Sequence, residues 1–94
     1  MANYLARVEL HNANYEDYEK LHEAMRKRGF VRTIVANDGK KYQLPTGTYV
    51  AEKTNATLEQ AYSASTAAAA ETGKTYWVIV VDWASARFAL QQVS

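Results

Sequence analysis

Residues 26–45 read RKRGFVRTIVANDGKKYQLP, and they predict the order of the elements around them. Gly29 stands where a helix needs a left-handed residue after its last turn. Residues 30–36 are mostly β-branched and apolar, which is typical of a strand. The pair Asp38-Gly39 tolerates the positive φ angles of a tight hairpin turn. The segment therefore predicts the end of a helix, a strand, a turn and a returning strand.

The returning strand is interrupted. Residues 41–44 and 48–52 both have strand composition, but Pro45-Thr46-Gly47 separates them. Proline lacks the N–H that a strand ladder needs, so a bulge, a bend or a sheet edge all fit this point. The register of the returning strand stays open.

A first strand is predicted before this segment, over residues 4–10. Its side chains alternate, so that one face of the strand is apolar and the other is mixed. The apolar face carries Tyr4, Ala6, Val8 and Leu10, and the mixed face carries Leu5, Arg7, Glu9 and His11.

Two helices are predicted. Asn14 can cap a helix over residues 15–28, and Thr57 with Gln60 forms a capping box for a second helix that Gly73 ends. The apolar stripe of the first helix contains Tyr18, Leu21, His22 and Met25. The stripe of the second contains Leu58, Ala61, Tyr62, Ser65, Ala68 and Ala69.

Residues 76–83 read YWVIVVDW, which predicts a well-buried strand. Residues 84–94 fit either a short helix or a further strand that pairs with another chain. The whole order is β-α-β-β-α-β, so we expect an α+β fold of the ferredoxin-like, split βαβ type. Right-handed crossovers then place both helices on one face of a four-stranded antiparallel sheet and leave the other face bare.

Composition limits the classes of function. The 94 residues predict a single domain over 1–94, and 48% hydrophobic residues provide a modest core. A net charge of +1 gives no strong overall field, and the absence of cysteine excludes disulfides and thiol chemistry. No signal peptide and no membrane span are apparent. We therefore expect a soluble, cytoplasmic protein without a membrane partner or an evident small-molecule cofactor.

The first candidate site is the polar trio Arg7, Glu9 and His11, which shares the mixed face of the first strand. A carboxylate can act as a base or hold a metal, a histidine can carry protons near neutral pH, and an arginine can bind a phosphate. The alternative is an ordinary solvated strand face. Because the only histidines are His11 and His22, a multi-histidine metal site is excluded.

The second candidate is a cationic group. Residues 26–41 hold six of the chain's eleven Lys and Arg against a single acid, Asp38. These cations would bind the phosphates of RNA without reading its sequence. Solubilising charges and helix-dipole complementation are the alternative. A seven-residue strand spans about 20 Å, so the cations before and after it fit either one patch or two. The members are Arg26, Lys27, Arg28, Arg32, Lys40 and Lys41.

Aromatic residues form a third candidate, because rings on an open sheet face can stack on unpaired bases. We expect most of the set Tyr42, Tyr49, Tyr76, Trp77 and Trp83 to be core or dimer contacts. His22 lies in the stripe of the first helix, where a packed, hydrogen-bonded histidine is expected.

Three segments, YLARVEL at 4–10, FVRTIVA at 30–36 and QLP at 43–45, resemble the GhoS family of small bacterial proteins. Its best-known member is the antitoxin of a type V toxin–antitoxin pair, an endoribonuclease that destroys its toxin's messenger RNA. The resemblance implies a ferredoxin-like fold and RNA as partner. The bare sheet face and the apolar tail Phe88-Ala-Leu90 predict a symmetric homodimer, because exposed apolar area often marks an interface. In fold-related nucleases an acidic residue near the end of the first strand supports metal-dependent cleavage, and Glu9 matches that position here. Mg²⁺ is then the cofactor implied.

Two functions follow as hypotheses. The first is RNA binding with endoribonuclease activity at Arg7, Glu9 and His11, in an antitoxin-like role. The second is a non-enzymatic, dimeric interaction module that uses the face or the edge of its sheet.

Overall fold

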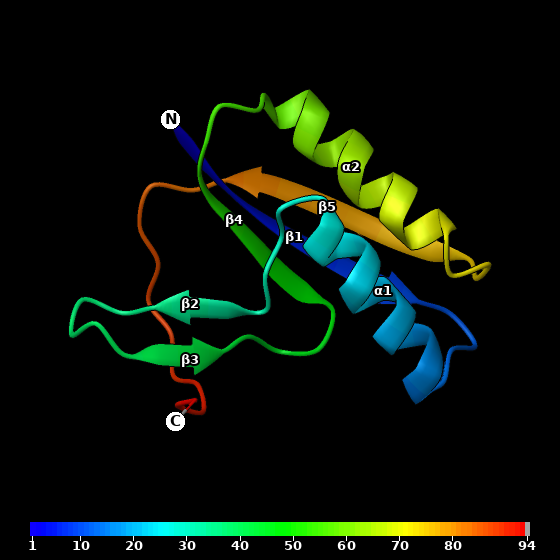
Figure 1. Cartoon of the computed structure of the whole chain (residues 1–94), viewed down its shortest axis with the longest axis horizontal. Coiled ribbons are helices and arrows are strands. Elements are labelled where there is room, and N and C mark those ends of the chain that lie inside the picture. The colour runs from blue at the N-terminus through cyan, green and yellow to red at the C-terminus, as the bar shows by residue number, and fades with distance from the viewer. Residues whose placement is uncertain (94) are drawn as a thin grey trace.

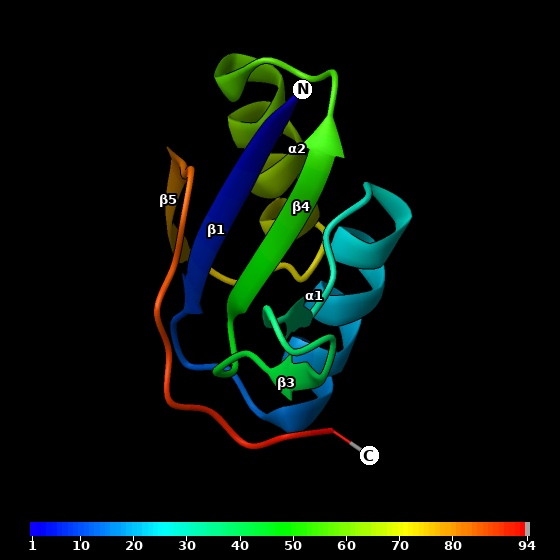
Figure 2. The same ribbon diagram turned by 90° about the vertical axis from the view of Figure 1, so that its left-hand side faces the viewer.

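The computed structural model describes residues 1–93 and shows a three-stranded antiparallel sheet covered by two helices, with a separate hairpin at one end (Figure 1). The sheet has the order β4-β1-β5, and the hairpin joins β2 to β3. Along the chain the elements are β1 (Ala2–Leu10), α1 (Tyr15–Lys27), β2 (Thr33–Val35), β3 (Lys41–Gln43), β4 (Thr48–Thr54), α2 (Leu58–Ala70) and β5 (Tyr76–Asp82). Both helices lie behind the sheet when its open face is turned to the viewer (Figure 2).

The central strand β1 has the faces that its alternation predicts. Tyr4, Ala6, Val8 and Leu10 are all buried against the helices, whereas Arg7 is exposed on the opposite face. Both neighbours run antiparallel to β1, with Arg7 beside Thr48 of β4 and Ile79 of β5. Arg7 therefore lies in the middle of the sheet, Glu9 lies further along the same strand, and His11 follows directly after its end.

The helices begin at the predicted caps. Asn14 accepts a hydrogen bond from the backbone N–H of Asp17, whose carboxylate accepts one from the N–H of Asn14. Thr57 and Gln60 make the same reciprocal pair at the start of α2. Each cap satisfies backbone donors that the first turn leaves unpaired.

Helix α2 departs from its predicted stripe. The small residues Ala61, Ser65, Ala68 and Ala69 are buried. Leu58 and Tyr62, however, are 47% and 46% exposed. The alanine-rich side packs on the sheet closely, and this turns the two larger side chains outward.

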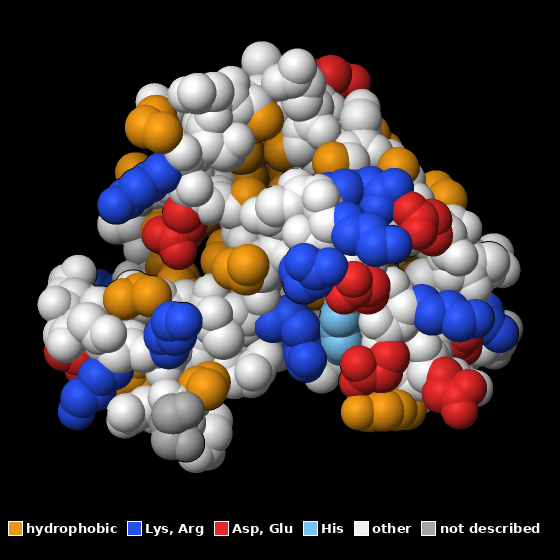
Figure 3. Space-filling view, in the orientation of Figure 1, with side chains coloured by type: hydrophobic (Ala, Val, Ile, Leu, Met, Phe, Trp, Pro, Cys, Tyr) orange, Lys and Arg blue, Asp and Glu red, His pale blue; other side chains and the backbone are white. Residues whose placement is uncertain are grey.

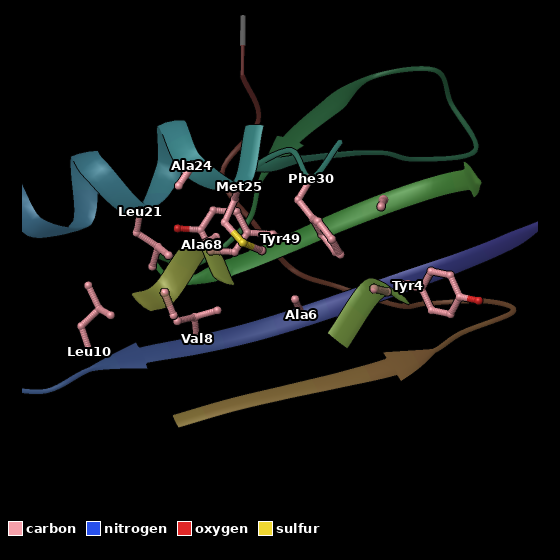
Figure 4. Packing of buried hydrophobic residues seen from close by; sticks show 13 residues of the cluster. Tyr4, Ala6, Val8, Leu10, Leu21, Ala24, Met25, Phe30, Tyr49 and Ala68 are labelled. Carbon is pink, nitrogen blue, oxygen red and sulfur yellow. The ribbon is translucent and has the colours of Figure 1, made fainter. Parts of the chain in front are cut away.

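The main core lies between the helices and the sheet (Figure 4). Leu21 and Met25 of α1 are fully buried against Val8 and Tyr49 of the sheet. A second, smaller cluster lies on the other face of the sheet, where Val50 packs with Ile34 and Leu44. The face of the sheet opposite the helices is therefore covered only around Val50 of β4.

The prediction of a four-stranded ferredoxin-like sheet is wrong. Val31 exchanges two backbone hydrogen bonds with Val50 of β4, at 2.8 and 2.9 Å, and no further residue of this segment joins the sheet. The C=O of Arg32 instead accepts from the N–H of Leu44, so that β2 pairs with β3 alone. The predicted strand 30–36 shortens to three residues.

The interruption at residues 45–47 explains this departure. Pro45 cannot donate to a ladder, and Gly47 has a φ of +85°. The C=O of Gly47 accepts a 2.7 Å hydrogen bond from the N–H of Val8, which ties the turn to β1. The chain therefore changes direction between β3 and β4, and the hairpin leaves the plane of the sheet.

Strand β5 lies within the predicted segment 76–83 and ends at Asp82, but it is not well buried. It is an edge strand that the helices cover on one face only. Trp77, Ile79 and Val81 point to the other face and are 70%, 60% and 41% exposed. The continuous apolar run made the strand resemble an interior one, although half of its side chains face solvent.

The segment after β5 folds back on its own hairpin as an extended chain. Gln43 donates its N–H to the C=O of Gln91, and Val93 donates to Lys41. Phe88 and Leu90 pack against the cluster around Val50. Of the two alternatives for 84–94, the described residues form no helix, and they pair within the chain; Ser94 lies outside the described residues.

Candidate functional site

The open face of the sheet brings the predicted trio together with residues of β5. Arg7 and Glu9 lie at alternate positions of β1 on this face. His11 follows directly after the strand, where its N–H donates to the C=O of Thr75. The register of the sheet places Trp77 of β5 beside Glu9 and Ile79 beside Arg7. The face therefore combines polar groups from the central strand with apolar groups from the edge strand.

Glu9 and His11 are in direct contact. The Oε2 atom of Glu9 lies 3.1 Å from Nε2 of His11, which is hydrogen-bond distance. The side chains are 47% and 31% exposed, so that both reach solvent. A carboxylate bonded to one nitrogen of an imidazole fixes the ring and its tautomer, and leaves the other nitrogen to exchange a proton.

Trp77 extends this pair into a larger site. Its ring meets that of His11 edge to face, with centroids 4.6 Å apart and an interplanar angle of 86°. Most of the indole remains exposed. The sequence contains the alternation that puts Trp77 on the open face, but only the register of β5 against β1 places it beside His11.

Arg7 supports the turn beside the site. Its guanidinium donates to the C=O of Thr46 at 2.9 Å, and it also reaches the C=O of Val8. Within residues 1–93 no carboxylate forms an ion pair with Arg7. Its charge is thus held by neutral carbonyls, and its side chain is exposed, so it is available to an anion.

The side chains of the site do not fit a resident Mg²⁺. This ion binds through oxygen ligands, commonly one or two carboxylates with waters or substrate phosphates. Glu9 is the only carboxylate of the trio, and one of its oxygens is bonded to His11. Over residues 1–93, no group of three or more acidic or histidine side chains gathers where it could hold a metal.

The predicted cationic group is divided. Arg26 forms a 2.6 Å ion pair with Glu23, and Arg28 a 2.5 Å ion pair with Glu71. Basic and acidic side chains alternate over this part of the surface (Figure 3). The remaining cations, which have no acidic partner in the described part of the chain, are Lys27, Arg32, Lys40 and Lys41.

The members of the cationic group also lie in two separate places. Lys40 and Lys41 lie at the tip of the β2–β3 hairpin, whereas residues 26–28 lie at the end of α1, on the opposite side of the hairpin (Figure 1). The six cations therefore do not form one continuous patch.

A hollow of about 370 Å³ beside α1 was not predicted. Phe30 and Val31 form its apolar part, and its charged lining is balanced, with two acids against two arginines. The charged side chains are Glu19, Glu23, Arg26 and Arg32. The lining also includes His22.

His22 is packed and hydrogen-bonded, as the sequence predicts. Its Nδ1 atom lies 2.6 Å from the hydroxyl of Tyr49. Burial, together with the positive charge of Arg32, lowers the pKa of His22. Burial also raises the pKa of Tyr49, so at neutral pH a protonated phenol lies beside a neutral imidazole.

Comparisons with protein-family models, curated proteins and solved structures find no match for this chain. Neither of the helices in residues 1–93 has the length and apolar character needed to cross a bilayer.

Proposed function

We propose that this protein binds single-stranded RNA on the open face of its sheet and cleaves it at the Glu9–His11 pair, as a cytoplasmic antitoxin of the GhoS type. The contact between these two side chains is the observation that supports the proposal most directly. It joins a carboxylate and an imidazole on an exposed surface beside an exposed tryptophan. The sequence resemblance to an endoribonuclease family supports the same activity.

Binding would use two kinds of contact. Trp77 offers an aromatic face on which an unpaired base can stack, and such stacking is tolerant of sequence. Arg7 lies where it can bind the neighbouring phosphate. Lys27, Arg32, Lys40 and Lys41 add longer-range attraction, while Arg26 and Arg28 must first exchange their carboxylate partners.

Cleavage would proceed by attack of the ribose 2′-hydroxyl. The hydrogen bond from Nε2–H to Glu9 leaves Nδ1 of His11 as the base that takes the 2′-hydroxyl proton. The bond from the 2′-oxygen to phosphorus forms, and the bond from phosphorus to the 5′-oxygen breaks. The leaving oxygen takes a proton from water, and His11 returns its proton to solvent. One product then ends in a 2′,3′-cyclic phosphate.

The test is a cleavage assay on mixed single-stranded RNA, with and without Mg²⁺ and with the end groups of the products identified. Glu9→Gln and His11→Ala should abolish cleavage and leave binding within about 2-fold, because neither change removes a phosphate contact. Glu52→Gln is the matched control, since Glu52 is an exposed glutamate on the neighbouring strand β4. Equal cleavage by Glu9→Gln and the wild type would overturn the assignment.

Binding is tested separately by its dependence on salt. Phosphate contacts release counterions, so the affinity should fall as the salt concentration rises. Replacing Arg32 and Lys40 by Ala should weaken binding and flatten this dependence. If no RNA binds at ~50 mM salt, where such contacts are strongest, the proposal of an RNA partner is wrong.

The second candidate is a non-enzymatic, homodimeric interaction module. The exposed apolar side chains of β5, above all Trp77 and Ile79, favour it, because exposed apolar patches often mark interfaces. Light scattering at high micromolar concentration should give twice the chain mass of 10.6 kDa. The tail gives this candidate no support, since Phe88 and Leu90 pack within their own chain.

A further inference from the structure

Strand β5 presents an unpaired backbone edge. It pairs with β1 on one side, and nothing in residues 1–93 pairs with its other side. His11 donates its N–H to the C=O of Thr75, and Trp83 donates to Asn3. Odd-numbered residues of this segment therefore direct their backbone groups toward β1. The backbone N–H and C=O groups of successive residues point to opposite sides of a strand. The backbone groups of the even-numbered residues therefore point away from β1, toward the free edge; these residues are Tyr76, Val78, Val80 and Asp82.

The edge lacks the features that usually prevent pairing. Natural edge strands are protected by lysines, prolines, bulges or inward charges. From Thr75 to Val81 there is no charged residue and no proline. The register of β5 against β1 is also continuous over all seven residues, without a bulge. The side chains beside this edge include the exposed Trp77, Ile79 and Val81.

We infer that a second copy of this chain pairs with β5 along this edge, antiparallel, about a two-fold axis that passes through Ile79. In this register Ile79 faces its own copy, and Trp77 of each chain faces Val81 of the other. The outward backbone groups match as well, with Val78 opposite Val80 and Tyr76 opposite Asp82. The pairs exchange about eight hydrogen bonds, because each hydrogen-bonded pair of an antiparallel ladder contributes two.

The symmetry of the strand favours a second copy over another partner. A two-fold interface requires one surface to complement itself. The exposed apolar positions of β5 are symmetric about Ile79, and no like charges face each other in the paired segment. A two-fold axis at Ile79 is also the choice that uses all seven residues of the strand. A shifted axis leaves outward donors and acceptors unpaired.

The pairing would leave the proposed RNA site accessible, because it occupies the edge of the sheet and not its face. Two three-stranded sheets would become one of six strands, with both Glu9–His11 pairs on the same open face. Standard interfaces bury ~800 Å² per partner, and one strand pair with its flanking side chains is smaller than that. We therefore expect a dimer that dissociates on dilution. The inference rests on the homodimer proposed above and specifies its strand and register.

Single cysteines test the register, because the chain has none of its own. Ile79 would form a non-hydrogen-bonded pair with its copy, and the Cβ atoms of such pairs lie close, ~4.5–5.5 Å apart. Ile79→Cys should therefore cross-link to a disulfide dimer under mild oxidation, at least ~10-fold more than Val81→Cys at equal concentration. Val81→Cys is the matched control. It is exposed on the same face of the same strand, but it would lie about 14 Å from its copy, four residues further along.

A second pair of variants covers the case in which Ile79→Cys does not fold. Trp77→Cys mixed with Val81→Cys should cross-link to each other, because these positions face one another in the proposed register.

Ile79→Lys should be monomeric by light scattering, whereas Tyr62→Lys, at an exposed position of α2, should remain dimeric.

The outcomes separate the two levels of the inference. A wild-type monomer at high micromolar concentration would overturn both the homodimer and the register. A dimer in which Ile79→Cys cross-links no better than Val81→Cys would overturn the β5 register alone. The RNA assays do not depend on either result.

Discussion

At the scale of single residues, Gly47 joins the turn before β4 to the central strand. Its φ is +85°, and a Cβ at this position would meet the carbonyl oxygen of Val8 and the guanidinium of Arg7. Gly47→Ala should lower the free energy of unfolding by about 2–4 kcal/mol, from backbone strain together with the clash. Urea denaturation measures this.

Gly39 is the matched control for that substitution. Its φ is +82°, but a Cβ there would meet nothing within 4 Å. Gly39→Ala should cost only the strain, about 1–2 kcal/mol. If both substitutions cost the same, the close approach of Gly47 to β1 contributes nothing to stability.

His22 predicts a dependence of stability on pH. Its pKa in the folded chain lies below the ordinary value of 6.5. The unfolded chain therefore takes up the proton first, and stability falls as the pH is lowered through about 6.5 toward the folded pKa. His22→Asn keeps an acceptor for the hydroxyl of Tyr49 and should flatten this part of the profile. Denaturation curves between pH 7.5 and 5.5 test it, and unchanged pH dependence would contradict it.

At the scale of elements, α1 stabilises the sheet through a few fully buried side chains. Leu21→Ala should lower the free energy of unfolding by ~2–5 kcal/mol, because it removes buried methyl groups and leaves a cavity. Leu58→Ala, at a 47% exposed position of α2, should cost less than ~1 kcal/mol. If Leu21→Ala lowers the free energy of unfolding by less than ~1 kcal/mol, Leu21 does not pack against the sheet as described.

Elements whose signals are local could be predicted from the sequence. Both helix caps and the faces of β1 depend on residues within a few positions of one another, such as Asn14 with Asp17. The place of β2 could not be predicted, because it depends on a contact between Gly47 and Val8, which are far apart in the chain. The exposure of β5 could not be predicted for the same reason. The order of strands in the sheet depends on contacts between distant residues, and that order decides whether an apolar strand lies at the edge or in the interior.

The same limit applies to the candidate site. Alternation within β1 predicts that Glu9 and His11 share a face, and the structure places them in contact. Trp77 could not be assigned to this site without the register of β5. Counting charges in residues 26–41 could not show which cations have acidic partners either. Glu71, which pairs with Arg28, lies 43 residues away in the sequence.

At the scale of the whole molecule, the tail after β5 packs against the smaller of the two cores. Phe88 packs in the cluster around Val50, and its ring centroid lies 5.3 Å from that of Tyr42. Phe88→Ala should cost about 1–3 kcal/mol, less than a fully buried phenylalanine. Arg87→Ala, at the exposed neighbour, should change stability by less than ~0.5 kcal/mol. Thermal and urea unfolding give both values, and equal effects would mean that the tail does not pack as described.

The attachment of the β2–β3 hairpin has a consequence for motion. Within residues 1–93, the backbone pairing between the segment of this hairpin and the main sheet consists of a single bridge, between Val50 and Val31, which lies just before β2. A segment held by so few hydrogen bonds can open while the rest stays folded. Amide protons of Ile34 and Tyr42 should therefore exchange with deuterated solvent well before those of Ala6 and Val8. The hairpin and the main sheet would then open as two separate cooperative units, and the main sheet would open more slowly. The Glu9–His11 pair belongs to the main sheet.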